Sequence, residues 1–257
     1  MKKVLKGIEP PLLARYRHKN PTGSWDMFKN SRARRQQLKQ QIIADQSGLC
    51  VYCEIDLKEQ DSHGNADYRV EHYHPKSDMT AGHNWALDWQ NLLGCCHGGS
   101  RPDVTDAAHR YTSPDCSCDI PKGSQNLDSV ILNPHQMPAF PPIFAFDRTT
   151  GEPSVDKVNC SIAGIDPIKA QATIRELRLD AKRLNSLRQT VLNKLNADVR
   201  NLLQRNSELS VGEALDRLAA TYLQKNSKHH WPPFFSAIRS YLGSSAEKHL
   251  RSMDYNG

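Results

Sequence analysis

Six of the seven cysteines of this chain lie between residues 50 and 118, and their spacing constrains the fold more than any other feature. Cys50 and Cys53 form a Cys-x-x-Cys pair, a tight turn that can direct two thiolates at one tetrahedral ion. The surrounding stretch has short apolar runs, and so long an irregular stretch in a folded domain usually needs a staple such as a metal. We therefore expect a zinc site rather than free thiols. The spacing leaves open which two of the later cysteines complete it, among Cys95, Cys96, Cys116 and Cys118.

The composition is that of a folded protein. Hydrophobic residues make up 38% of the 257 residues and charged residues 24%, enough for one large domain or two small ones. No apolar run approaches the ~18 residues that a membrane-spanning helix needs, and no signal-peptide core follows the basic first six residues. We expect a cytoplasmic protein that does not enter a membrane.

The net charge of +6 is unevenly distributed. Residues 1–47 hold eleven Lys and Arg against three Asp and Glu, whereas residues 48–125 hold six against twelve. A basic arm can follow nucleic-acid phosphates, although a solvated helix face has the same composition. The candidate nucleic-acid-binding residues are Arg32, Arg34, Arg35, Lys39 and Lys76.

A carboxylate and an imidazole are adjacent at Glu71-His72. Side chains that are adjacent on a strand point to opposite faces, so both reach one site only where the strand ends or bends. Pro75 is consistent with such an end. A neutral His72 can take a proton from water near pH 7, and Glu71 can hold a divalent cation. A surface pair without chemistry is the alternative.

Apolar spacing predicts helices on both sides of this middle segment. Pro10 and Pro11 predict an extended start, and one helix is expected from about residue 24 to Gly48. Residues 68–71 read as a brief strand, and residues 94–125 as loop. A hairpin is expected around residues 144–152, followed by helices from residue 167 with a break near 179–180, and a last short helix after 232–233.

These patterns predict an α+β fold in three segments. Residues 1–47 form a basic arm and helix, residues 48–125 a core with the zinc site, and residues 126–257 a hairpin followed by a helical C-terminal domain. The helical stripes of the last segment predict core packing and carry no chemistry by themselves.

The middle segment resembles an HNH endonuclease. The resemblance rests on Cys50-x-x-Cys53, on Glu71-His72, and on Asn91-Leu92-Leu93 followed by Cys96. Farther on, residues 118–122 have the spacing of the family's Cys-His-x-x-Lys ending, with Asp in place of His. The spacing departs from the family, because 21 residues separate Cys96 from Cys118, where the last two zinc cysteines are usually three apart.

The resemblance implies a zinc-stapled ββα-metal core with named roles. His72 is the general base, Asn91 orients the loop, and Glu71 holds a catalytic Mg²⁺ or Mn²⁺. Cys96 and Cys118 complete the structural zinc site. Asp119 is the second ligand of the catalytic ion, with His97 as its rival, and Lys122 joins the catalytic group.

Outer motifs are similar to the PtuB subgroup. They include Lys6-Gly7-x-Glu9-Pro10, the helix of Trp25, the segment 131–134 and Arg188. This resemblance implies the nuclease half of an anti-phage system, either Septu or retron-associated. Its expected partners are a PtuA-like ATPase of the ABC/SMC type and, through it, a retron reverse transcriptase and its msDNA. DNA is the substrate favoured by the family, and RNA or tRNA stays open. A zinc-stabilised module that binds nucleic acid or the ATPase without cutting is the alternative.

Overall fold

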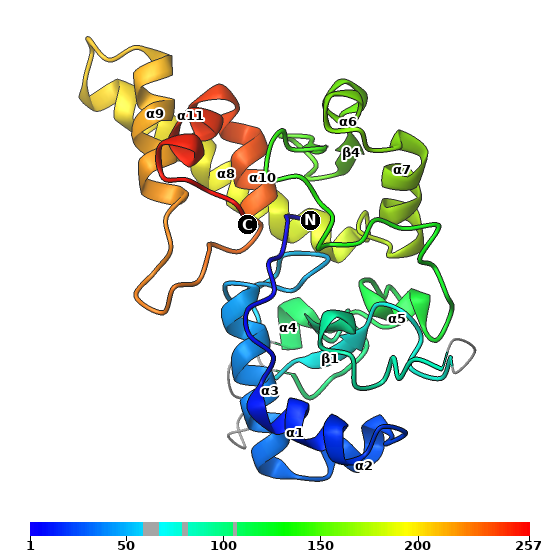
Figure 1. Cartoon of the computed structure of the whole chain (residues 1–257). Helices are drawn as coiled ribbons and strands as arrows, with labels where there is room; N and C mark the ends of the chain where they lie inside the picture. Colours follow the sequence, from blue (N-terminus) through cyan, green and yellow to red (C-terminus); the bar gives the residue numbers. More distant parts are fainter. Residues whose placement is uncertain (59–66, 79–81, 105–106) are drawn as a thin grey trace.

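The computed structural model describes residues 1–58, 67–78, 82–104 and 107–257, and it combines many helices with two small antiparallel sheets. Figure 1 shows the N-terminal half below and the C-terminal half above, with the two termini side by side near the middle. Lys3 Nζ donates to Asn256 Oδ1 at 2.9 Å, which joins the ends of the chain. None of the helices described has the length and apolarity to cross a membrane.

Three helices form the N-terminal arm, α1 (Pro11–Lys19), α2 (Trp25–Lys29) and α3 (Arg32–Asp45). The extended start expected at Pro11 is wrong, because Pro11 takes the first position of α1, where its fixed φ and missing N–H are tolerated. The single helix expected to Gly48 is interrupted at residues 30–31. Ser31 starts a new helix there, and its hydroxyl accepts a hydrogen bond from the Arg34 N–H.

The first sheet pairs β1 (Arg69–His72) with β2 (Leu92–Cys95), and the 3-10 helix η1 (Trp89–Asn91) precedes β2. Gly94 lies opposite Val70, and a Cβ there would be 2.7 Å from Ile42 on α3. The missing side chain lets α3 pack directly on the sheet. The loop expected over residues 94–125 is only partly right, since it also holds the end of β2 and two short helices, α4 (Ala107–Arg110) and α5 (Asp119–Lys122).

The C-terminal half begins with the expected hairpin, β3 (Phe144–Phe146) and β4 (Pro153–Val155). The expected break near residues 179–180 is confirmed. The short helix expected after residues 232–233 starts at Phe235. Neither the first nor the last of the following helices was expected from the apolar spacing. They are α6 (Lys157–Ala163), α7 (Pro167–Glu176), α8 (Lys182–Arg205), α9 (Val211–Tyr222), α10 (Phe235–Leu242) and α11 (Ser244–Ser252).

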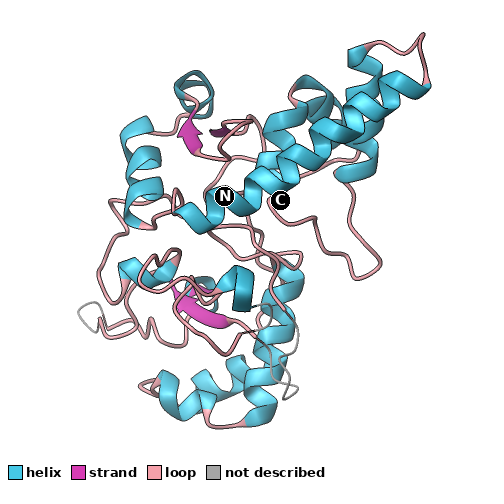
Figure 2. Ribbon diagram, turned by 180° about the vertical axis from the view of Figure 1, so that it is seen from behind, coloured by secondary structure: helices cyan, strands magenta, loops and turns pink. Residues whose placement is uncertain are grey.

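One hydrophobic core runs through both halves, from Leu92 in β2 to Leu184 in α8 and Phe235 in α10. Figure 2, from behind, shows the long helix α8 crossing the upper part of the molecule. Glu54 joins the halves, because its carbonyl accepts a hydrogen bond from the Phe234 N–H and its carboxylate accepts two from Ser236. The helical C-terminal part therefore packs directly on the segment that carries the Glu-His pair.

Candidate active site and metal centre

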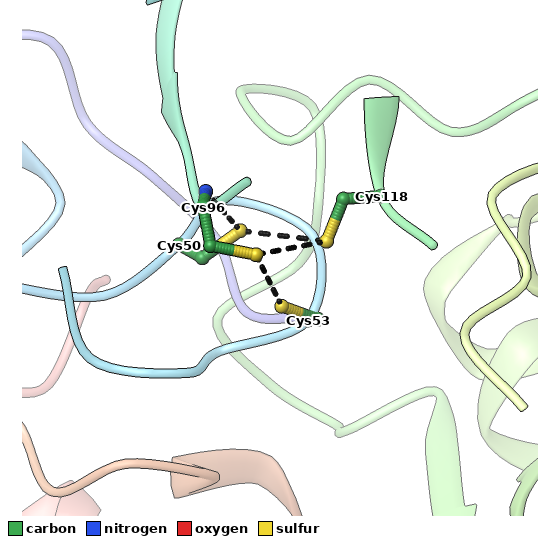
Figure 3. A group of neighbouring side chains, drawn as sticks. All are labelled: Cys50, Cys53, Cys96 and Cys118. Carbon is green, nitrogen blue, oxygen red and sulfur yellow. Dashed lines mark hydrogen bonds between the residues drawn. The ribbon is translucent and has the colours of Figure 1, made fainter. Parts of the chain in front are cut away.

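Four cysteine sulfurs converge in the middle of the molecule. The Sγ atoms of Cys50, Cys53, Cys96 and Cys118 all lie within 4.8 Å of one another, and all four residues are buried (Figure 3). Sγ–Sγ distances are 3.7 Å for Cys50–Cys118 and 3.5 Å for both Cys53–Cys96 and Cys96–Cys118. A tetrahedral ion with Zn–S bonds of about 2.3 Å has sulfur–sulfur edges of about 3.8 Å. The group can hold a metal ion such as zinc.

Separate elements bring these cysteines together. Cys50 and Cys53 lie in the turn after α3, Cys96 follows β2, and Cys118 precedes α5. Backbone N–H groups also point at the sulfurs, from Cys96 to Cys50 Sγ and from Gly98 to Cys96 Sγ, each at 3.4 Å. Gly98 has φ +59°, and a Cβ there would lie 2.3 Å from the Ser117 carbonyl oxygen, so only glycine fits.

The structure shows which of the later cysteines join Cys50 and Cys53, a choice that the spacing left open. Cys96 and Cys118 belong to the sulfur group, whereas Cys95 and Cys116 lie outside it. In the part of the chain that the structure describes, this is the one cluster of three or more potential metal ligands. The 21 residues between Cys96 and Cys118 do not keep their sulfurs apart, because the Ser117 N–H donates to the Gly98 carbonyl and brings the two loops together.

Asn91 fixes the loop that follows β1. Its Oδ1 accepts a hydrogen bond from the His74 N–H at 2.7 Å, and its Nδ2 donates to the carbonyls of His74 at 2.9 Å and Trp85 at 2.8 Å. Asn91 is buried, at the end of η1. The Asn91 amide thus bonds to both the N–H and the carbonyl of His74, and this sets the direction in which the chain leaves β1.

His72 is the last residue of β1, and its ring is buried between two contacts. The indole of Trp25 meets it edge-on, with ring centroids 4.9 Å apart. Its Nε2 lies 3.2 Å from the Ala86 carbonyl oxygen, which can only accept, so Nε2 carries the proton and Nδ1 the lone pair. Burial lowers the pKa of His72 to about 4, and the ring is neutral at pH 7.

Glu71 and His72 contact different elements, as adjacent strand residues do. Glu71 Oε1 lies 2.7 Å from the Nζ of Lys122 on α5, and the same Nζ donates to the His72 carbonyl at 2.9 Å. Lys122 is 2% exposed. Burial raises the pKa of Glu71, although the charge of Lys122 opposes this. The α5 helix is therefore bound to the end of β1 through one buried ion pair.

Asp119, at the start of α5, adds a second carboxylate to this region. It is 2% exposed, and burial together with the charge of Glu71 raises its pKa to about 7. Arg69 Nη2 lies 2.9 Å from Asp119 Oδ2, yet neither carboxylate oxygen accepts a hydrogen bond of normal geometry. A buried carboxylate whose oxygens accept no hydrogen bond, in the same region as the buried carboxylate of Glu71, fits a site that takes a divalent cation.

His97 and Asp119 lie in different surroundings. His97 Nε2 pairs with Asp67 Oδ1 at 3.0 Å, and burial lowers the pKa of the ring. The charge of Glu71 contributes to the raised pKa of Asp119. His97 thus pairs with Asp67, whereas the surroundings of Asp119 include the charge of Glu71.

The candidate phosphate contacts divide into two kinds. The Arg34 guanidinium lies 4.3 Å from the centre of the Tyr16 ring, and Lys39 Nζ donates to the Tyr68 carbonyl at 2.6 Å. Both therefore hold the fold together. The exposed candidates are Arg32, Arg35 and Lys76, of which Arg35 also donates from Nη1 to the Lys29 carbonyl.

Two residues of the site were missed from the sequence. Trp25 reaches His72 from α2, which no local spacing reveals. Arg69, which pairs with Asp119, stands two residues before Glu71 on β1 and so on the same face. The two-residue alternation of side chains along a strand could therefore have placed Arg69 on the same face as Glu71.

A comparison with known proteins places the chain in a family. It is 34% identical over 262 aligned residues, 94% of this chain and 93% of the relative, to the Escherichia coli protein named "Retron Ec83 putative HNH endonuclease". No family model matches the chain. An identity at this level over nearly the whole of both proteins shows common descent, so the chain belongs to the HNH endonucleases and is a nuclease.

Proposed function

We propose that the protein is a metal-dependent endonuclease that hydrolyses nucleic-acid phosphodiester bonds at the end of β1, with His72 as general base. The observation that carries the proposal is the placement of His72. Its ring is neutral, it is fixed by the Ala86 carbonyl, and it follows directly on Glu71. In this proposal the strands β1 and β2 and the helix α5 would be the two strands and the helix of a ββα-metal core.

The hydrogen bonds of His72 determine which atom acts as base. Nε2 is committed to the Ala86 carbonyl, so Nδ1 accepts a proton from water. The oxygen of that water then attacks phosphorus, and the phosphorus–oxygen bond to the leaving nucleotide breaks. Trp25 and Asn91 keep the ring and the loop in place, as a preorganised site requires.

Glu71 and Asp119 would hold the catalytic Mg²⁺ or Mn²⁺. Asp119 forms an ion pair with Arg69, but its oxygens accept no hydrogen bond of normal geometry, and this together with its raised pKa supports the assignment. When bound, a divalent ion stabilises the negative charge that develops on the phosphate and the leaving oxygen. Lys122 keeps the Glu71 carboxylate in position and brings a second positive charge to the site. The four cysteines would hold a structural Zn²⁺ that fixes α5 against the sheet.

DNA is the proposed substrate, and exposed Arg32, Arg35 and Lys76 are its proposed phosphate contacts. The test uses purified protein stripped of loosely bound ions with EDTA and then given Mg²⁺, Mn²⁺ or neither. Plasmid DNA and tRNA are offered separately. Divalent-dependent cutting of DNA is expected, cutting of tRNA alone would move the substrate to RNA, and no cutting of either with any ion would contradict the proposal.

The biological role that we propose is anti-phage defence. The relative carries a retron in its name, and the outer motifs are similar to the PtuB subgroup. A PtuA-like ATPase of the ABC/SMC type would hold the nuclease, and a retron reverse transcriptase with its msDNA would join through the ATPase. Co-expression with a PtuA-like ATPase, followed by size-exclusion chromatography, is expected to give one complex. Separate elution of the two proteins would count against this partner.

A further inference from the structure

A buried cation without a carboxylate partner lies beside the four-cysteine group. Arg183, on α8, is 7% exposed, and its Nε is buried without a hydrogen-bond partner. Within the described residues no Asp or Glu pairs with it. A buried guanidinium is costly unless a negative group compensates it, so an anionic partner is expected nearby.

The metal-loaded four-cysteine group can serve as the negative partner of Arg183. Four thiolates around one divalent ion carry a net charge of two minus, which is also buried. Arg183 Nη2 donates to the Ser117 hydroxyl at 2.6 Å, and that hydroxyl donates to Cys118 Sγ at 3.9 Å. Arg183 and Cys96 also line one small pocket together with Gly98 and Gly99. Burial lowers the pKa of Arg183, but the four cysteines outweigh burial and leave it above its ordinary value.

Arg188, another buried arginine on α8, is a weaker candidate for a charge partner of the cysteine group. It stands five residues later on α8 and is buried, but its Nη1 already donates to Asn185 Oδ1 at 3.0 Å and to the Gly151 carbonyl at 3.4 Å. Its guanidinium also lies over the Phe146 ring. Arg183 is thus the buried arginine of α8 whose hydrogen bond to Ser117 leads to a cysteine of the group.

The backbone makes the same connection. The Cys118 N–H donates to the carbonyl of Leu177, just after α7, at 2.9 Å. The fourth cysteine of the group is therefore attached to the C-terminal helices by its backbone, and Arg183 reaches the group from those helices. Gly99 leaves room for this, since a Cβ there would be 3.3 Å from Arg183 Nε.

We infer that Arg183 is the charge partner of the metal-loaded cysteine group and that this pairing fastens α8 to the nuclease core. The inference depends on metal binding by the four cysteines, which belongs to the proposed function. Removing the charge should weaken metal retention, because changes to groups that support metal ligands typically cost 10–100-fold in affinity.

The test measures how fast bound zinc passes to a coloured chelator, together with the visible absorption of the cobalt-loaded protein. Arg183→Gln is expected to release zinc at least 10-fold faster than the parent, and Arg183→Lys to keep most of the retention. Arg200→Gln changes an exposed arginine on the same helix and serves as the matched control. Ser117→Ala, which breaks the bridge and keeps the charge, should release zinc faster than the parent by a smaller factor.

The outcomes separate the two proposals. A parent protein that binds neither zinc nor cobalt would overturn the metal centre itself. A parent that binds metal while Arg183→Gln releases it at the parent's rate would overturn only the role of Arg183. If Arg183→Gln does not fold, the decision falls to Ser117→Ala, and release from that variant at the parent's rate would overturn the pairing.

Discussion

Replacing Asn91 with aspartate tests whether one amide fixes the loop after β1. Asn91→Asp keeps the size of the side chain and the oxygen that accepts from the His74 N–H, but it removes both donors. The His74 carbonyl is buried, and losing its donor should cost about 1–3 kcal/mol. The Trp85 carbonyl is partly exposed, and its loss should cost about 1 kcal/mol. Folding should weaken by about 2–4 kcal/mol.

Thermal and urea unfolding measure this loss. For a protein of this size, 1 kcal/mol corresponds to roughly 2–4 °C, so the melting temperature should fall by about 4–16 °C. Asn193→Asp, an exposed change on α8, is the control and should stay within about 0.5 kcal/mol of the parent. Nuclease activity should fall with Asn91→Asp because the loop carries His72 at its start. An unchanged melting curve would refute the reasoning.

Three further predictions concern the metal centre, the DNA contacts and a buried lysine. Cys50→Ser should abolish zinc binding and lower the melting temperature, and an unchanged zinc content would count against the metal centre. Arg32→Gln should weaken DNA binding and reduce the salt dependence of that binding by about one charge, whereas Arg34→Gln should lower stability. Equal salt slopes for the parent and Arg32→Gln would contradict a phosphate contact by Arg32. Burial lowers the pKa of Lys6 to about 7 in the folded protein, whereas in the unfolded chain Lys6 stays protonated up to about pH 10.5. The stability of the parent should therefore rise relative to that of Lys6→Met as the pH rises from 7 to 10.5. A stability difference that does not change with pH would argue against this burial.

Elements whose signal lies within a few residues could be predicted from the sequence. The hairpin at residues 144–155 and the break between α7 and α8 follow from turn residues and apolar spacing, and both are observed. The Cys50-x-x-Cys53 pair could also be identified as a metal-binding turn from its spacing. The spacing of the later cysteines carried no such information, and their choice depended on a family resemblance.

Long-range packing accounts for what was missed. Ser31 divides a continuous helical pattern because its hydroxyl caps a new helix, a competition that periodicity does not register. Trp25 meets His72 across 47 positions of sequence, and Arg183 meets Ser117 across 66. Arg34 and Lys39 have the composition of a phosphate-binding face, yet their charges are directed to aromatic rings and carbonyls of the protein itself.

Cleavage by His72→Ala is the most direct test of the central claim, that a neutral imidazole at the end of β1 activates the attacking water. The variant should keep the zinc content of the parent and stay folded, with a lower melting temperature because the buried ring and its bond to the Ala86 carbonyl are lost, and it should cut DNA about 10²–10⁴-fold more slowly in Mg²⁺ or Mn²⁺. His229→Ala, at an exposed position, should cut at the parent's rate. Cleavage by folded, zinc-loaded His72→Ala at the rate of the parent would contradict the account.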